Sequence, residues 1–257
     1  MPLVDIFMSK QWRWLALFCI TLFMHNALAG EIISDIPTPA GFVRAPSPSD
    51  SYIEYLRALP LKSNKTIKTW SGDSLPDSTY NTLAVVDLPL LFNEDLEQCA
   101  DFSMRFWAEY LNSINALDEL SLFDFYGNKK PFSSKKQTFR DYLHWHMTHS
   151  NSYSISLGAT TVNPLIDVQT GDMFVQNNSG GGIGHVSVIV DEAVNTAGLK
   201  VYLVGYSFMP AQQFHIEKAT EEYGVEGWFT AEGYQQYAEH QFGSFGKAKV
   251  MRYEKHK

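Results

Sequence analysis

The hydrophobic pattern of this chain changes once along its length, and that change limits the folds it can adopt. Before Asn163-Pro164 the apolar residues recur at helical spacing, whereas after it they form short β-like runs separated by turn residues. We predict strands at 172–176, 185–191 and 200–208, the last two joined as a hairpin by a turn at 195–198. Helices followed by hairpin-linked strands predict an α+β domain whose helices pack on one face of an antiparallel sheet.

The longest predicted helix spans 93–117, with Asn93 as its cap. Its apolar stripe at helical spacing consists of Leu96, Cys99, Ser103, Phe106 and Tyr110. A second helix is predicted over 136–149, and a shorter one begins near Ser49 or Ser51 and is stopped by Pro60. Two short strands are predicted at 66–70 and 82–86.

Composition places the chain among globular proteins. Its 257 residues are 45% hydrophobic and 19% charged, which excludes disordered, collagen-like and coiled-coil chains and favours one compact domain. The formal charge is −8, and the basic residues form no dense block. Binding a polyphosphate backbone requires clustered cations, so we expect no nucleic-acid partner.

The N-terminal 29 residues have the pattern of a secretory signal peptide. Lys10 and Arg13 precede an apolar stretch over 15–24, and Ala27-Leu28-Ala29 supplies small residues before the cleavage point. The apolar stretch is too short to cross a bilayer core of about 30 Å. We therefore expect a periplasmic or secreted protein without a membrane span after cleavage. Residues 30–48 form a Pro-rich, extended lead-in, and 49–257 form a single domain.

Cleavage at this point removes Cys19 and leaves Cys99 as a single cysteine. Cysteines of exported proteins usually pair, so a solitary thiol needs an explanation. It can be a buried inert thiol, half of an intermolecular bridge or a reactive nucleophile. At this stage all three remain open.

Cys99 on a helix and His185 at the start of a later strand are the two residue types that a thiol acyl-transfer enzyme uses. A helix N-terminus would favour the thiolate. A cap at Asn93 opposes this role, because it places Cys99 more than one turn inside the helix, whereas a cap as late as Glu97 restores it. A core cysteine and a strand-start histidine are the structural alternatives.

Two other patterns point to bound ligands less well. His144, His146 and His149 invite a metal site, but only the last two share a helix face and no carboxylate or thiol completes a zinc set, so a polar helix end is favoured. The glycine-rich loop at 177–184 lacks the Lys-Ser/Thr and following helix of a phosphate-binding loop. We expect neither a metal nor another cofactor.

Many dispersed segments make the chain resemble an uncharacterised family of exported bacterial proteins, domain-of-unknown-function family 4846. The matching segments are Tyr55-Leu56-Arg57, Leu59-Pro60-Leu61, Gln98-Cys99-Ala100-Asp101, Met104-Arg105, Ala108-Glu109-Tyr110-Leu111, Phe139-Arg140, Tyr142-Leu143, Gly171-Asp172, Gly184-His185, Val188-Ile189-Val190-Asp191, Ser207 and Met209-Pro210-Ala211-Gln212. This resemblance implies export but no activity.

A more distant resemblance concerns chemistry. Gln98-Cys99 opening a helix, Gly171-Asp172 on one strand and Gly184-His185 starting the next are similar to papain-like amidases and cell-wall endopeptidases of the NlpC and CHAP types. That resemblance implies a papain-like fold with Cys99 as nucleophile, His185 as base, and Tyr206 or Ser207 as the group that orients the imidazole. The implied oxyanion and substrate-binding residues are Gln98, Asp172, Gly184 and Gln212.

The chain departs from the first family at one informative position. Family members often carry Gln where this chain has Tyr206, and a phenol need not reach His185 as an amide does. Ser207 and Gln212 are possible substitutes. We therefore predict an exported cysteine amidase or endopeptidase acting on peptidoglycan stem peptides, with an inactive papain-like module that binds cell-wall fragments or an envelope protein as the alternative.

Overall fold

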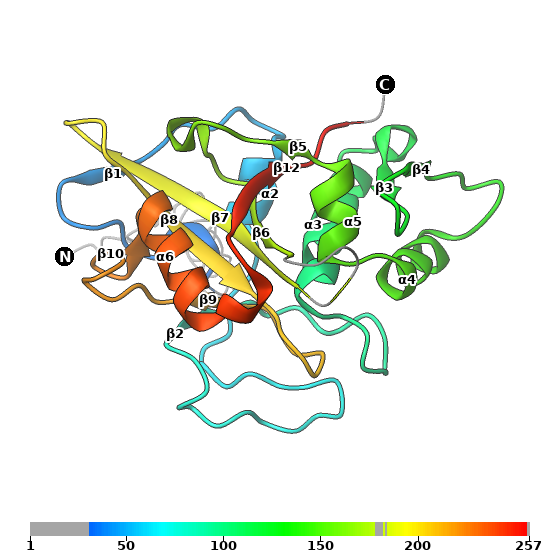
Figure 1. The fold of residues 1–257 in the computed structure, drawn as a ribbon, viewed down its shortest axis with the longest axis horizontal. Helices are drawn as coiled ribbons and strands as arrows, with labels where there is room; N and C mark the ends of the chain where they lie inside the picture. Colours follow the sequence, from blue (N-terminus) through cyan, green and yellow to red (C-terminus); the bar gives the residue numbers. More distant parts are fainter. Residues whose placement is uncertain (1–30, 178–181, 183, 256–257) are drawn as a thin grey trace, which may run out of the picture.

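The computed structural model describes residues 31–177, 182 and 184–255 (Figure 1). The predicted signal peptide and most of the predicted glycine-rich loop lie outside the described residues. Within them, no helix combines the length and the apolar character needed to cross a membrane.

The centre of the fold is an antiparallel sheet of ten strands. Its main path runs β10-β11-β8-β7-β6-β12-β5. Off this path, β1 pairs with β7, and β9 pairs with both β2 and β8. The strands are β1 (Phe42–Arg44), β2 (Thr82–Val85), β5 (Thr160–Thr161), β6 (Met173–Gln176), β7 (His185–Asn195), β8 (Lys200–Tyr206), β9 (His215–Glu217), β10 (Gly224–Val225), β11 (Trp228–Phe229) and β12 (Lys249–Arg252). A separate hairpin pairs β3 (Ser121–Phe123) with β4 (Lys129–Pro131).

Five α-helices accompany the sheet in the described residues. They are α2 (Tyr52–Arg57), α3 (Cys99–Ser113), α4 (Phe139–His149), α5 (Ser152–Gly158) and α6 (Ala231–Gln241). Single 3₁₀ turns occur at Ile33–Asp35, Leu117–Glu119, Leu165–Asp167 and Gly243–Phe245. The predicted α+β class is confirmed.

Helices cover both faces of the sheet, so the prediction of one covered face is wrong. Phe102 and Phe106 of α3 pack with Val186 and Val188 of β7 in the larger core. On the other face, α6 lies over β7 and β8 and buries Tyr234 beside Ile189 in the smaller core (Figure 1). The strands β7 and β8 carry apolar side chains at successive positions, and such runs require cover on both faces.

Helix α3 begins at Cys99, six residues later than the predicted cap at Asn93. The carboxylate of Glu97 holds the preceding loop, because it accepts the backbone N–H groups of Leu91 and Phe92 and pairs with Arg105 at 2.8 Å. These contacts join the loop to the helix in a non-helical path. Asp101 Oδ2 then accepts the N–H of Gln98 at 2.8 Å and caps the helix.

Most other predicted elements are confirmed with changed boundaries. The first helix starts after Ser51, whose side chain accepts the N–H of Glu54, and α4 starts after Thr138, inside the predicted range. The hairpin turn at 195–198 separates β7 from β8. The predicted strand at 66–70 is wrong, because that segment forms only isolated bridges, Lys68 with Ser74 and Thr69 with Gln212.

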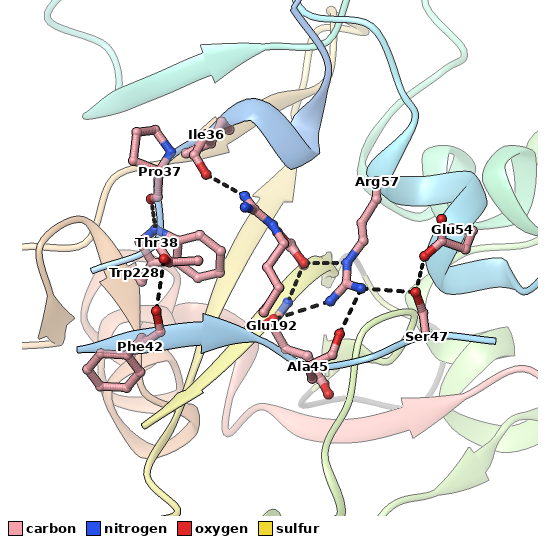
Figure 2. A network of polar contacts seen from close by, with 12 residues as sticks. Ile36, Pro37, Thr38, Phe42, Ala45, Ser47, Glu54, Arg57, Glu192 and Trp228 are labelled. Carbon is pink, nitrogen blue, oxygen red and sulfur yellow. Dashed lines mark hydrogen bonds and ion pairs between the residues drawn. The ribbon is translucent and has the colours of Figure 1, made fainter. Parts of the chain in front are cut away.

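The N-terminal lead-in is tied to the sheet by a buried ionic network. Strand β1 pairs with β7, and Asp191 of β7 binds Arg44 at 2.7 Å and Arg57 at 2.6 Å. Arg57 also donates to the carbonyl of Ala45 and to Ser47 Oγ (Figure 2). Moving one of these segments away would leave a buried charge without its counter-ion, which is destabilising. The network therefore holds the lead-in, helix α2 and β7 together.

Candidate functional site at the start of helix α3

The alternation of side chains along β7 decides how the predicted catalytic residues are arranged. Val186 and Val188 point towards α3 and belong to the larger core. His185 and Ser187 point towards α6, because Ser187 Oγ contacts both His185 Nε2 at 2.9 Å and Tyr234 Oη of α6 at 2.6 Å. Residues on opposite faces of one strand cannot contact each other through its backbone.

Cys99 lies on the α3 face. It is the first residue of α3, is 9% exposed, and its Sγ lies 3.9 Å from the carbonyl oxygen of Gly184. Burial raises the pKa of the thiol to about 12, although backbone N–H groups of Val186, Ala100 and Cys99 itself oppose the shift. The thiol is therefore protonated at neutral pH.

A cavity of about 330 Å³ opens beside Cys99. Its walls come from the loop before α3, the first turn of α3, the end of α4, the start of α5, and Gly184 and Met209. Hydrogen-bonding side chains supply much of the wall, namely Asp95, Gln98, Asp101, Thr148, Ser150, Asn151 and Ser152. The size and the mixed lining suit a small polar ligand.

Two predicted binding residues, Gln98 and Gly184, line this cavity with Cys99. Gln98 Nε2 donates to Asp95 Oδ1 at 3.2 Å. A Cβ at position 184 would collide with the carbonyl oxygen of Gln176 and with Ser152 Oγ, so glycine is required by close packing. The structure thus brings Gln98, Cys99 and Gly184 together at one cavity.

His185 lies on the other face, in aromatic surroundings. It is 1% exposed, and its ring centroid lies 4.1 Å from that of Phe242 and 5.0 Å from that of Tyr206. Burial lowers the pKa of the imidazole to about 3. Nδ1 of His185 has no hydrogen-bond partner among the described residues. The structure therefore does not pair His185 with Cys99.

Tyr206 belongs to a buried polar cluster beside His185. Its hydroxyl donates to Glu217 Oε2 at 2.9 Å and lies 2.9 Å from Tyr237 Oη. His215 Nε2 lies 3.3 Å from Glu217 Oε2, without hydrogen-bond geometry. Burial lowers the pKa of His215 and raises that of Tyr206 well above its usual range. The phenol thus binds Glu217 rather than the imidazole of His185.

The remaining predicted residues have other partners. Ser207 Oγ donates to the carbonyl of Gln212 at 2.8 Å and faces the loop before α3 through a longer contact with the carbonyl of Glu97. Gln212 Nε2 donates to Tyr80 Oη at 2.9 Å. Asp172 forms a two-point ion pair with Arg252 at 2.6 and 2.8 Å. None of these contacts joins Cys99 to a base.

The three clustered histidines point to three different partners. His144 Nε2 lies 2.8 Å from Glu94 Oε1, His146 Nδ1 lies 2.8 Å from the carbonyl of Phe123, and His149 Nδ1 lies 2.8 Å from that of Trp145. In the part of the chain that the structure describes, no three His, Cys, Asp or Glu side chains are grouped to hold a metal ion.

The sequence did not predict all the polar residues at the cavity beside Cys99 or in the polar cluster around Tyr206. Thr148, Asn151 and Ser152 line the cavity at Cys99 but lie about fifty residues downstream, where no motif marks them. His215 and Glu217 were detectable in principle, because two ionisable residues that flank Ile216 share one face of a strand.

Comparison with known families identifies one matching family. The profile of a domain of unknown function, DUF4846, matches residues 32–134 and 121–252. The chain belongs to this family. Comparison with curated proteins gives no match, and comparison with solved structures gives none either. Membership in DUF4846 assigns no activity.

Proposed function

We propose that this DUF4846 protein is an exported binding module that holds a short peptide, of the peptidoglycan stem type, in the cavity at the start of α3. The separation of Cys99 from His185 by the sheet carries the proposal, because a buried neutral thiol without a base cannot attack an amide at neutral pH. We also propose that the fold derives from papain-like enzymes, which accounts for the helix-start cysteine and the strand-start histidine.

The cavity supplies the groups that a peptide needs. Its amide, hydroxyl and carboxylate side chains match the N–H and C=O groups of a peptide backbone, and Leu96, Met147 and Met209 supply an apolar wall. Met209 is partly exposed and borders the cavity, so it is available to contact a ligand side chain. Cys99 contributes surface to the bound peptide and no bond to it.

Titration calorimetry with a synthetic stem tetrapeptide tests the proposal. We expect saturable binding to the wild type and to Cys99→Ser, with the peptide recovered intact. Thr148→Trp should abolish binding, because Thr148 is exposed and lines the cavity. His149→Trp is the matched control, since His149 is the next exposed residue and lies outside the cavity lining. Absence of binding to the wild type would overturn the proposal.

A cysteine amidase or endopeptidase is the second candidate function. The observation in its favour is that the backbone N–H groups of Cys99, Ala100 and Val186 lower the pKa of the thiol, as donors to a thiolate do. That mechanism requires His185 to turn towards the Cys99 side of β7 and take the thiol proton. The sulfur then attacks the amide carbonyl, the C–N bond breaks as the amine leaves with that proton, and water hydrolyses the thioester to the acid and the free thiol. Mass spectrometry of the tetrapeptide after incubation decides between the candidates: fragments that the wild type produces and Cys99→Ser does not would establish the enzyme.

A further inference from the structure

One arginine differs from the others in the described part of the chain. Four of the five described arginines pair with carboxylates: Arg44 and Arg57 with Asp191, Arg105 with Glu97 and Glu109, and Arg252 with Asp172. Arg140, the second residue of α4, has no carboxylate partner among the described residues. In a chain of net charge −8 an unpaired guanidinium stands out.

Arg140 is nevertheless held in place. Its guanidinium lies 4.5 Å from the centroid of the Phe92 ring, and one terminal nitrogen donates to the carbonyl of Leu91. The cation–π contact and one backbone hydrogen bond hold the guanidinium beside the Phe92 ring. The remaining N–H groups have no partner among the residues that the structure describes, which leaves them available to a ligand.

Arg140 lines a cavity of about 380 Å³ that is distinct from the cavity at Cys99. Lys68 adds a second positive charge, and its Nζ donates only to the carbonyl of Gly72, at 3.3 Å, among the described residues. No described Asp or Glu lines this cavity. The carboxylates of Asp73 and Glu94, close in the sequence, contact Ser71 and His144, and in the described residues neither forms an ion pair with Arg140 or Lys68.

The lining also includes one exposed aromatic side chain and two amides. Trp70 is 36% exposed and lines the cavity with Asn93 and Gln213. Gln213 Oε1 accepts Lys62 Nζ and the N–H of Lys68, so its NH₂ group is left without a partner in the described structure. An indole face offers an apolar surface to the C–H face of a sugar ring, and amides bind its hydroxyls.

We propose that this cavity, the Arg140 site, binds a carboxylate-bearing sugar. The guanidinium of Arg140 takes the carboxylate through two N–H groups, Lys68 adds a second positive charge, and the ring lies on Trp70. Asn93 and Gln213 bind ring hydroxyls. The site uses a cavity separate from the one at Cys99, so it does not depend on the proposed function.

Calorimetric titration of the purified chain with matched sugar pairs tests the Arg140 site. The pairs are glucuronic acid with glucose, and N-acetylmuramic acid with N-acetylglucosamine. We expect each acid to bind at least tenfold more tightly than its neutral partner, with the difference shrinking at high salt. Equal affinity for acid and neutral sugar, or no binding of either acid, would overturn the proposal.

Variants locate the binding. Arg140→Gln should remove the preference for the acid, Lys68→Gln should reduce it, and Trp70→Ala should weaken both members of a pair. Lys136→Gln is the control, an exposed cation on the segment before α4 that does not line the cavity. Thermal unfolding confirms that each variant is folded. An unchanged preference in Arg140→Gln contradicts the proposal, as would tighter binding of N-acetyl-dialanine than of either sugar acid.

Discussion

The two residues expected to react together, Cys99 of α3 and His185 of β7, lie on opposite sides of β7 and have different surroundings. On the α3 face, Cys99 borders a cavity and has backbone N–H groups around its sulfur. On the α6 face, His185 is packed among Phe242, Tyr206 and Phe208, without access to solvent. Because side chains alternate along a strand, one residue of offset separates a ligand cavity from a closed aromatic core.

Burial acts on both groups in the direction that opposes catalysis. It raises the pKa of the Cys99 thiol to about 12 and lowers that of the His185 imidazole to about 3, because each shift favours the uncharged form. A thiolate next to an imidazolium needs the opposite shifts. At neutral pH we therefore expect an uncharged Cys99 thiol and an uncharged His185 imidazole, neither of which affects the protonation of the other. The following experiments test these expectations.

Alkylation of Cys99 should show the largest effect. A thiol with a pKa near 12 has on the order of 1000-fold less thiolate at neutral pH than a free cysteine with a pKa of about 8.5. We expect iodoacetamide to react with the native protein correspondingly slowly, and at the same rate in His185→Ala. Guanidinium-unfolded protein, as the control, should react at the free-thiol rate. A fast native reaction that slows in the variant would mean that the two residues are coupled.

His185→Ala should destabilise the α6 face strongly. The substitution removes a fully buried ring that contacts Phe242 and Tyr206, and it leaves Ser187 Oγ with one hydrogen-bond partner fewer. We expect the free energy of unfolding to fall by about 3 kcal/mol in urea titration. His149→Ala is the control, because His149 is exposed and surface changes usually stay within about 0.5 kcal/mol. A loss below 1 kcal/mol would show that the aromatic packing contributes little.

Local patterns predicted much of this arrangement. The hairpin β7-β8 follows from its turn residues, and α4 from its apolar spacing. The start of α3 could not be predicted from local patterns. It depends on the buried Glu97, which pairs with Arg105 and binds the loop before the helix, and helix propensity does not include such contacts. The cover on both faces of the sheet could have been predicted, because β7 and β8 carry apolar side chains at successive positions.

The candidate site was predictable only in part, for a geometric reason. Gln98, Cys99 and Gly184 meet as expected, because one contact between the start of α3 and the start of β7 brings them together. The orientation of His185 could not be predicted, because a motif at the start of a strand gives the position of a residue along the chain but not the face of the sheet on which its side chain lies. Thr148 and Asn151 reach the cavity through the tertiary packing of α4 and α5, which sequence spacing does not encode.

Gly184→Ala tests the close packing just before β7, beside Cys99. The added Cβ would collide with the backbone carbonyl oxygen of Gln176 in β6 and with Ser152 Oγ of α5, so the start of β7, β6 or α5 must move. We expect a loss of about 2 kcal/mol in the free energy of unfolding and weaker binding at the cavity beside Cys99. Gly243→Ala is the matched control, because nothing lies within 4 Å of a Cβ there. Equal stability of the two variants would show that the packing around Gly184 yields easily.

The pH dependence of the free energy of unfolding gives the smallest expected effect, counted per pH unit, and it reports directly on the protonation of His185 on the α6 face. The pKa of His185 is about 3 in the folded protein and about 6.5 when unfolded. Between these values the unfolded chain binds more protons, so stability falls as the pH is lowered from about 6.5 towards 3, by up to about 1.36 kcal/mol per pH unit. His215, whose pKa burial also lowers, adds to the fall with the same sign.

The advantage of wild type over His185→Ala should therefore shrink as the solution is acidified, because the variant lacks this protonation. Urea titrations of both proteins between pH 7 and pH 4 measure the difference directly. Groups common to both proteins cancel in that comparison. A difference that stays constant with pH would place a charged imidazole in the folded protein, and His185 would then need an anionic partner that the contacts on the α6 face do not provide.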